Sequence, residues 1–198
     1  MAQKSAAVLL ADGFEEIEAA TVIDVLRRAG VHVHVLGVGA RSDAMRTGSH
    51  GLSMGVDGRI DDVAAGVWSS VDALVLPGGM PGAAHLRDDA AVQAHLVAHH
   101  ARGGLVGAIC AAPIALVPGG LLAGRRATCF PGFEAQLVNA RVSDSAVVVD
   151  GNVVTSRGVG TALSFALALV DLLVGAARAE ELRAQMLVAG NGARGTAQ

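Results

Sequence analysis

Cys110 is the residue of this chain with the clearest capacity for covalent chemistry. It directly follows the apolar run 105–109 and precedes a helix-like segment over 111–117. A strand that turns sharply into a helix forms a nucleophile elbow, in which the turn residue projects from the carboxyl edge of the sheet. Backbone N–H groups and the helix dipole then lie beside the thiol, and we expect them to lower its pKa. The same pattern also fits a small buried hydrophobic residue, which is what most free cysteines are.

Glu18 is the second candidate, because it falls on the apolar side of a predicted helix over 15–29. Glu15 points the same way. A buried carboxylate is costly unless it is paired, hydrogen-bonded or protonated, so we expect the pKa of Glu18 to be raised and its proton to be donated to a Cys110 thiolate. The alternative is that acidic residues in a first helical turn only complement the helix dipole, an interpretation that suits Glu16 well. The apolar side consists of Ala19, Val22, Ile23, Val25, Leu26 and Ala29.

Backbone N–H groups near Cys110 are the third part of the predicted site. Gly78 and Gly79 follow the apolar run 72–76 and let the backbone approach a bound carbonyl closely. The N–H group of Ala111 lies at the start of the segment after the thiol. We expect Gly79 and Ala111 to stabilise an oxyanion. Taken alone, the two glycines fit a plain turn after Pro77 equally well.

The elements that position these residues predict an α/β fold. Apolar runs joined by helices indicate a mostly parallel sheet that is covered on both faces, which makes three layers. The carboxyl ends of its strands gather the loops at 12–14, 77–80 and 110 at one edge, where ligands bind in such sheets. The expected strands are 5–11, 31–38, 72–76, 105–109 and a small hairpin of 147–150 with 153–156, and the expected helices are 15–29, 88–102, 161–175 and 178–189.

Composition narrows the class of protein. With 198 residues, 52% of them hydrophobic and 17% charged, the chain predicts one domain over residues 1–190 and a flexible C-terminal tail over 191–198. A net charge of −3 argues against nucleic-acid binding. The apolar stretch 162–177 is short for a membrane span and contains Asp171, so we expect a buried helix and no membrane partner. Two cysteines without a secretory leader indicate free thiols and a cytoplasmic location.

Four ordered motifs resemble the ThiJ/PfpI superfamily, in the branch of the parkinsonism-linked protein deglycase and its bacterial ThiJ/YajL-like relatives. The resemblance runs nearly end to end and implies a flavodoxin-like sandwich, usually a homodimer. It also implies an oxidation-sensitive cysteine at the elbow and a protonated glutamate against it, roles that carry over to Cys110 and Glu18. The backbone oxyanion role carries over to Gly79 and Ala111. The motifs are Leu9-Leu10-Ala11-Asp12-Gly13-Phe14-Glu15-Glu16-Ile17-Glu18, Val75-Leu76-Pro77-Gly78-Gly79, Ala108-Ile109-Cys110-Ala111-Ala112-Pro113 and Thr155-Ser156-Arg157-Gly158-Val159-Gly160-Thr161.

The chain departs from this pattern at two positions. Some members carry a histidine that faces the cysteine, and Phe130 occupies that position here. Members with hydrolytic triads carry histidine directly after the cysteine, where this chain has Ala111. The resemblance brings His50 toward the pocket, apparently across a dimer interface, although an exposed loop histidine is the competing interpretation. We expect Glu15, Gly78, His50 and Phe130 as further pocket residues.

The sequence also yields predictions for cofactors, metals, the remaining histidines and Cys129. We expect no cofactor and no metal, because no His or Cys spacing resembles a zinc site. His95, His99 and His100 are predicted to be solvated on the helix over 88–102. Cys129 is expected to line the core or the pocket.

Together these features predict a cofactor-independent, cysteine-dependent enzyme. We expect it to act on small reactive carbonyls, in a glyoxalase III-type conversion of methylglyoxal to lactate, on glycated adducts as a protein deglycase, or on both, and therefore as a lyase or hydrolase. The alternative is a redox sensor or oxidative-stress chaperone that uses oxidation of the same cysteine. Another small-molecule hydratase or hydrolase is a minor alternative, because a fold does not determine a function.

Overall fold

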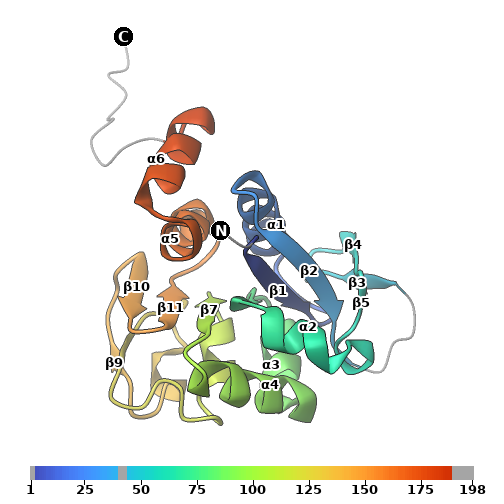
Figure 1. Cartoon of the computed structure of the whole chain (residues 1–198). Helices are drawn as coiled ribbons and strands as arrows, with labels where there is room; N and C mark the ends of the chain where they lie inside the picture. Colours follow the sequence, from blue (N-terminus) through green and yellow to red (C-terminus); the bar gives the residue numbers. More distant parts are fainter. Residues whose placement is uncertain (1–2, 40–43, 189–198) are drawn as a thin grey trace.

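A seven-stranded sheet lies at the centre of the structure, a computed structural model that describes residues 3–39 and 44–188 (Figure 1). The strand order is β10-β11-β7-β6-β1-β2-β5. All neighbouring strands are parallel except β10 and β11, which form the predicted antiparallel hairpin. The strands are β1 (Ser5–Leu10), β2 (His32–Gly37), β5 (Gly58–Arg59), β6 (Ala73–Leu76), β7 (Leu105–Ile109), β10 (Val147–Asp150) and β11 (Val153–Ser156).

Helices cover both faces of the sheet, so the predicted three-layer, mostly parallel α/β fold is confirmed (Figure 1). One face packs against α1 (Glu16–Arg28), α5 (Ala162–Val174) and α6 (Ala176–Gln185), and the other against α3 (Gly82–Asp88) and α4 (Ala90–Ala101). Side chains of β1 alternate between the two cores, with Val8 in the first and Leu9 in the second. No described helix has both the length and the hydropathy that crossing a bilayer requires. The tail predicted at 191–198 lies outside the described residues.

Several elements differ from the sequence prediction. The segment after Cys110 is a 3-10 helix over Ala112–Leu116 rather than a longer α-helix. The helix predicted from residue 88 begins at Ala90, because the Asp89 side chain caps it by accepting from the N–H groups of Ala91 and Val92. Elements that the sequence pattern did not predict are β3 (Met45–Thr47), β4 (Ser53–Gly55), β5, α2 (Ala65–Ser70), α3, β8 (Arg126–Ala127), β9 (Arg141–Val142) and 3-10 helices at Ile60–Asp62, Glu134–Gln136 and Val159–Thr161.

His99 corrects the prediction that the histidines of this helix are solvated. Its side chain is 1% exposed, and its Nε2 lies 3.0 Å from the Leu105 carbonyl while its Nδ1 lies 2.8 Å from an Arg102 guanidinium nitrogen. Burial lowers the pKa of His99 to about 4, and the Arg102 charge adds to the effect. His99 is therefore neutral at pH 7 and fastens α4 to the start of β7.

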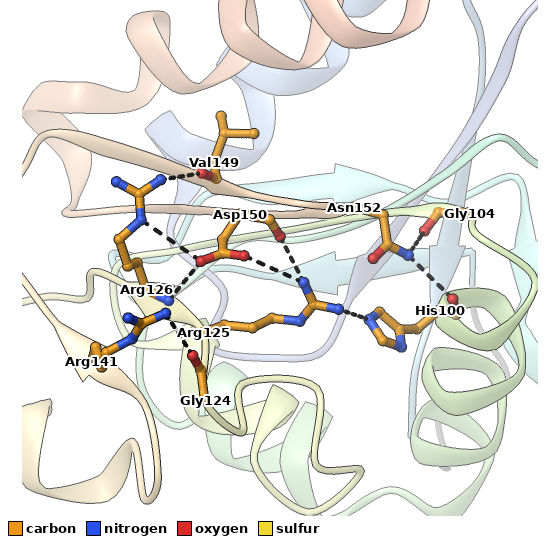
Figure 2. Close-up of polar contacts among 9 residues, drawn as sticks. All are labelled: His100, Gly104, Gly124, Arg125, Arg126, Arg141, Val149, Asp150 and Asn152. Carbon is orange, nitrogen blue, oxygen red and sulfur yellow. Dashed lines mark hydrogen bonds and ion pairs between the residues drawn. The ribbon is translucent and has the colours of Figure 1, made fainter.

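An arginine-rich cluster fastens β8 to the hairpin (Figure 2). The Asp150 carboxylate accepts from the Arg126 N–H at 2.9 Å, and Arg125 donates to the Asp150 carbonyl at 3.0 Å. The Arg126 N–H and the neighbouring guanidinium groups hold the pKa of Asp150 below its ordinary value. Two residues further on, the Thr128 N–H donates to the Thr155 hydroxyl at 2.9 Å. These bonds fix the segment that leads to Phe130.

Candidate active site

Cys110 has the backbone geometry of an elbow residue. Its φ angle is +64°, in the left-handed region that residues other than glycine rarely adopt. The conformation is held on both sides, because the Cys110 N–H donates to Ser156 at 2.9 Å and its carbonyl accepts from the Phe130 N–H at 2.8 Å. The residue is 8% exposed at the carboxyl end of β7. This strained, overdetermined position at the sheet edge is the kind that functional residues occupy.

Backbone N–H groups from two loops converge on the Cys110 sulfur. The N–H groups of Ala111 and Gly79 both hydrogen-bond to it and favour the thiolate. Gly78 makes this approach possible, since a Cβ atom there would lie 2.6 Å from Cys110 Cβ and 2.9 Å from the Glu18 carboxylate. The structure therefore brings the predicted oxyanion groups together with the thiol.

Glu18 lies against the thiol and is completely buried. Its Oε2 accepts from the Gly78 N–H at 2.8 Å, whereas its Oε1 has no hydrogen-bond partner among the described residues. Burial raises the pKa of Glu18 to about 7, and the nearby charge of Glu15 contributes to the increase, although the Gly78 N–H opposes it. The position and the direction of the pKa shift agree with the sequence prediction.

The sequence analysis predicts a lowered pKa for Cys110. When Glu18 is ionised, this prediction is wrong. Burial and the charge of the adjoining Glu18 raise the pKa of Cys110 to about 12, and the N–H groups of Ala111 and Gly79 offset only part of this. The two groups titrate together, because each negative charge disfavours the other. The pair loses its first proton with the pKa of about 7 that belongs to Glu18. It loses its second proton only with a pKa of about 12. The one-proton form of the pair therefore accumulates as the pH rises through about 7 and persists at moderately alkaline pH.

Glu16 is a buried residue whose role the sequence did not reveal. Its carboxylate accepts from the His50 N–H at 2.7 Å and the Leu52 N–H at 3.3 Å, and the His50 ring nitrogen Nδ1 lies 3.1 Å away. Although burial raises it, these partners hold the pKa of Glu16 below its ordinary value. Glu16 therefore anchors the loop after β3 beside the site and does more than complement the helix dipole. The donors are backbone N–H groups more than 30 residues away in the sequence, so no local sequence pattern predicts these hydrogen bonds.

Glu15 and His50 lie at the same place. The Glu15 side chain caps α1 by accepting from the Glu18 N–H at 2.9 Å, and its other oxygen lies 4.0 Å from His50 Nδ1. The His50 side chain is 73% exposed, as expected of a loop histidine, and its Nδ1 lies beside the Glu15 and Glu16 carboxylates of the same chain. Glu15, Glu16 and His50 bring ligand atoms within 4.8 Å of one another, a grouping able to hold a metal ion that the sequence did not predict.

Phe130 lies close to the thiol. Its side chain is 45% exposed, and its ring lies 3.1 Å from the position that a Cβ atom on Gly158 would occupy. The same position lies 4.0 Å from the Cys110 sulfur. The preceding residue, Cys129, points into the core of the other face, where burial raises its pKa to about 11. Phe130 is thus near the sulfur, and Cys129 is a core residue.

This arrangement has the parts required for addition of a thiolate to a carbonyl carbon. These parts are the Cys110 thiol, the two backbone N–H groups beside it, and the Glu18 carboxyl group with a pKa of about 7.

Comparisons with protein families, curated proteins and solved structures agree with one another and cover most of the chain. Residues 4–172 match the model of the DJ-1/PfpI family. Protein dj-1beta of Drosophila melanogaster is 40% identical over 190 residues, which cover 95% of this chain and 99% of that protein. Its crystal structure has a TM-score of 0.88 at 38% identity and covers 96% of this chain and 100% of that chain.

Two further relatives carry information about chemistry in their names. A glutathione-independent glyoxalase of Caenorhabditis elegans is 34% identical over 184 residues, which cover 91% of this chain and 95% of that protein. A structure of oxidized DJ-1 from Toxoplasma gondii has a TM-score of 0.87 at 38% identity and covers 94% of this chain and 100% of that chain.

Proposed function

Since the chain belongs to the DJ-1/PfpI family, we propose that it is a cofactor-independent enzyme in which Cys110 attacks small reactive carbonyls such as methylglyoxal. Lactate is the product, and deglycation of early glycated adducts is a related activity of the same site. The observation that supports this most is the convergence of two backbone N–H groups and a buried carboxyl group on one thiol. The relative named as a glutathione-independent glyoxalase adds weight.

The first step is addition of the thiolate to the aldehyde carbon of methylglyoxal, which forms a hemithioacetal. The Gly79 and Ala111 N–H groups stabilise the oxyanion that develops as the C–S bond forms. Glu18 gives its proton to this oxyanion, so the hemithioacetal is neutral and Glu18 becomes a carboxylate. The carboxylate then removes the proton of the carbon bonded to sulfur and returns it to the neighbouring carbonyl carbon. The hydroxyl proton of the hemithioacetal passes to the oxygen of that neighbouring carbon, and the carbon bonded to sulfur becomes the thioester carbonyl. The resulting lactoyl thioester is hydrolysed by water, which releases lactate and regenerates the thiolate.

The single proton of the Glu18 and Cys110 pair prepares the first step. When this proton resides on the unpartnered Oε1 of Glu18, the negative charge is on sulfur, and the carboxyl group donates to it instead of repelling it. The nucleophile is thus generated by proton transfer within the pair. This assignment explains why a thiol whose pKa is raised by an ionised neighbour remains reactive.

The proposal is tested by measuring lactate formation from methylglyoxal with purified protein, before and after alkylation of Cys110. Mass spectrometry locates the alkyl group and confirms that Cys129 is unmodified. We expect alkylation to stop turnover, and lactate formation that survives complete alkylation of Cys110 contradicts the proposal.

The pH dependence of turnover tests the role of Glu18. We expect kcat/KM to rise with pH through about 7, where the pair loses its first proton, and then to remain level. Glu18→Gln preserves the shape of the side chain but cannot store the proton, so Cys110 must titrate as a buried thiol with a raised pKa. The inflection should then move to higher pH, and the rate at pH 7 should fall about 100-fold. An inflection that stays near pH 7 in Glu18→Gln shows that another group controls the rate.

A redox sensor is the second candidate function, favoured by the same groups around sulfur and by the oxidized relative from Toxoplasma gondii. Two equivalents of peroxide convert a thiolate to a sulfinate, whose oxygens would accept from Gly79 and Ala111. We expect mild peroxide to add two oxygens to Cys110 before Cys129, which is fully buried. Peptide mass spectrometry over a peroxide series measures the order, and earlier oxidation of Cys129 contradicts the sensor function.

We also propose that the protein is a homodimer and resides in a reducing compartment such as the cytoplasm. Ile17 on α1 and Leu52 beside β4 are 56% and 67% exposed, and these apolar side chains flank the His50 loop that the family resemblance places at a dimer interface. Both cysteines are free, as expected in such a compartment. Light scattering of the purified chain measures the mass directly, and a monomer at micromolar concentration contradicts the dimer.

A further inference from the structure

Phe130 presents an aromatic ring to solvent directly beside the nucleophile. Large apolar side chains are normally buried, yet 45% of Phe130 is exposed. The ring is not on a loose loop, since the Phe130 N–H donates to the Cys110 carbonyl at 2.8 Å. The preceding segment is held by the Arg126 and Asp150 bonds (Figure 2) and by the bond from Thr128 to Thr155. The ring therefore has a defined position relative to the thiol.

The Phe130 ring and the Cys110 sulfur both lie close to Gly158. A methyl group placed on Gly158 would be 3.1 Å from the Phe130 ring and 4.0 Å from Cys110 Sγ. Phe133 packs against Phe130 in an edge-to-face arrangement with ring centroids 6.5 Å apart. Because Gly158 has no side chain, it adds no atom to this tight region between the ring and the sulfur.

The residues near the thiol are of two kinds. Phe130 and Phe133 are aromatic, whereas the Glu15 carboxylate acts on Glu18 through its charge and Glu16 lies beside Glu15. A carbonyl compound that bonds to the sulfur must direct its substituent somewhere, and the carboxylates disfavour an anionic substituent. An apolar ring gains both burial and an aromatic contact on the Phe130 side.

We infer that Phe130 determines substrate preference, and that the preferred substrates are uncharged 2-oxoaldehydes with an aryl substituent. This inference rests on the proposed function, because it names the substrate class of the same thiol. The substituent lies against Phe130 while the aldehyde carbon bonds to Cys110. Phenylglyoxal is the probe, and its product by the same steps is mandelate, formed with the net addition of one water molecule.

The experiment compares kcat/KM for phenylglyoxal and methylglyoxal by quantifying mandelate and lactate. Phenylglyoxal also modifies arginine side chains, so product is measured rather than loss of aldehyde, and Cys110→Ser supplies the background. We expect the parent to prefer phenylglyoxal by about tenfold, the size of one aromatic contact. Phe130→Ala should lower the ratio of the two kcat/KM values about tenfold. Gly158→Ala should lower the ratio too, since its methyl group enters the space between the ring and the sulfur.

The controls separate this inference from the proposed function. Leu172→Ala removes a side chain that is 47% exposed at the opposite end of the strands, and it should leave the ratio unchanged. Phe130→Leu keeps an apolar side chain without the ring and should give an intermediate ratio, which also serves if the alanine variant does not fold. Equal ratios in the parent and both Phe130 variants overturn the inference while the proposed function stands. Absence of both products from the parent overturns the proposed function, and the inference with it.

Discussion

Replacing Cys110 with serine is expected to lower methylglyoxal turnover by about 10³ to 10⁶-fold. A serine hydroxyl is far less acidic than a thiol and needs an adjacent base to become a nucleophile. Phe130 and Ala111, which adjoin Cys110, offer no basic group for this purpose. Glu18 accepts a proton from a thiol near neutral pH but is too weak a base for an aliphatic hydroxyl. The substitution therefore removes the nucleophile while the pocket remains.

We expect the Cys110→Ser protein to fold, so a loss of turnover can be assigned to the missing thiol. Serine is smaller than cysteine by the difference between oxygen and sulfur, and it can keep the φ of +64° because the bonds to Ser156 and Phe130 use backbone atoms. The control is Cys129→Ala, which removes the other thiol from the core and should retain turnover. Lactate formation and thermal unfolding are measured for both proteins. Turnover by a folded Cys110→Ser protein within tenfold of the parent contradicts covalent catalysis by Cys110.

The sequence predicted those parts of the site that depend on local pattern. A buried apolar run ending at Cys110 was sufficient to predict the elbow, and the helical wheel was sufficient to predict that Glu18 is buried. Both predictions depend on periodicity, which the tertiary structure preserves. The loops at 12–14, 77–80 and 110 met at the carboxyl edge because parallel strands leave no other arrangement.

The parts that were missed depend on partners that are distant in sequence. His99 appeared to be a solvated helix residue, but Leu105 and Arg102 satisfy both ring nitrogens, so burial is tolerated. The strands β8 and β9 are only two residues long each; they pair with each other, and Asp150 of β10 accepts from the Arg126 N–H of β8. Hydrophobic periodicity contains no information on such bonds.

The pKa of the Cys110 thiol is a second property that the sequence pattern alone does not predict. The elbow pattern correctly indicated which N–H groups would favour the thiolate. Burial and the charge of Glu18 act in the opposite direction and are larger, and their size depends on depth and distance rather than on residue type. Reactivity of Cys110 therefore depends on where one proton resides, which only the assembled site determines.

Replacing Gly79 with alanine is expected to destabilise the protein by at least about 3 kcal/mol. The residue has a φ of +85°, and a Cβ atom would lie 2.5 Å from the Glu15 nitrogen and 2.6 Å from the Gly13 carbonyl oxygen. These are backbone atoms that cannot move alone, since the Glu15 N–H donates to Gly78 and the Gly13 N–H donates to Thr47. The added methyl group must push apart the loops at 12–14 and 77–80 and so displace the Gly79 N–H from the sulfur.

Gly30→Ala is a matched control, because Gly30 has the same φ of +85° but no atom within 4 Å of the added Cβ. It should cost only the left-handed strain of about 1 kcal/mol, or about 3 °C in Tm for a chain of this size. Gly79→Ala should lower Tm by about 10 °C, and it should lose turnover at temperatures where it remains folded, whereas Gly30→Ala should not. Equal losses of stability would mean that backbone strain alone acts at both positions. A larger loss at Gly79, accompanied by loss of activity, identifies the close approach of the two loops as the feature that both stabilises the edge of the sheet and positions the oxyanion site.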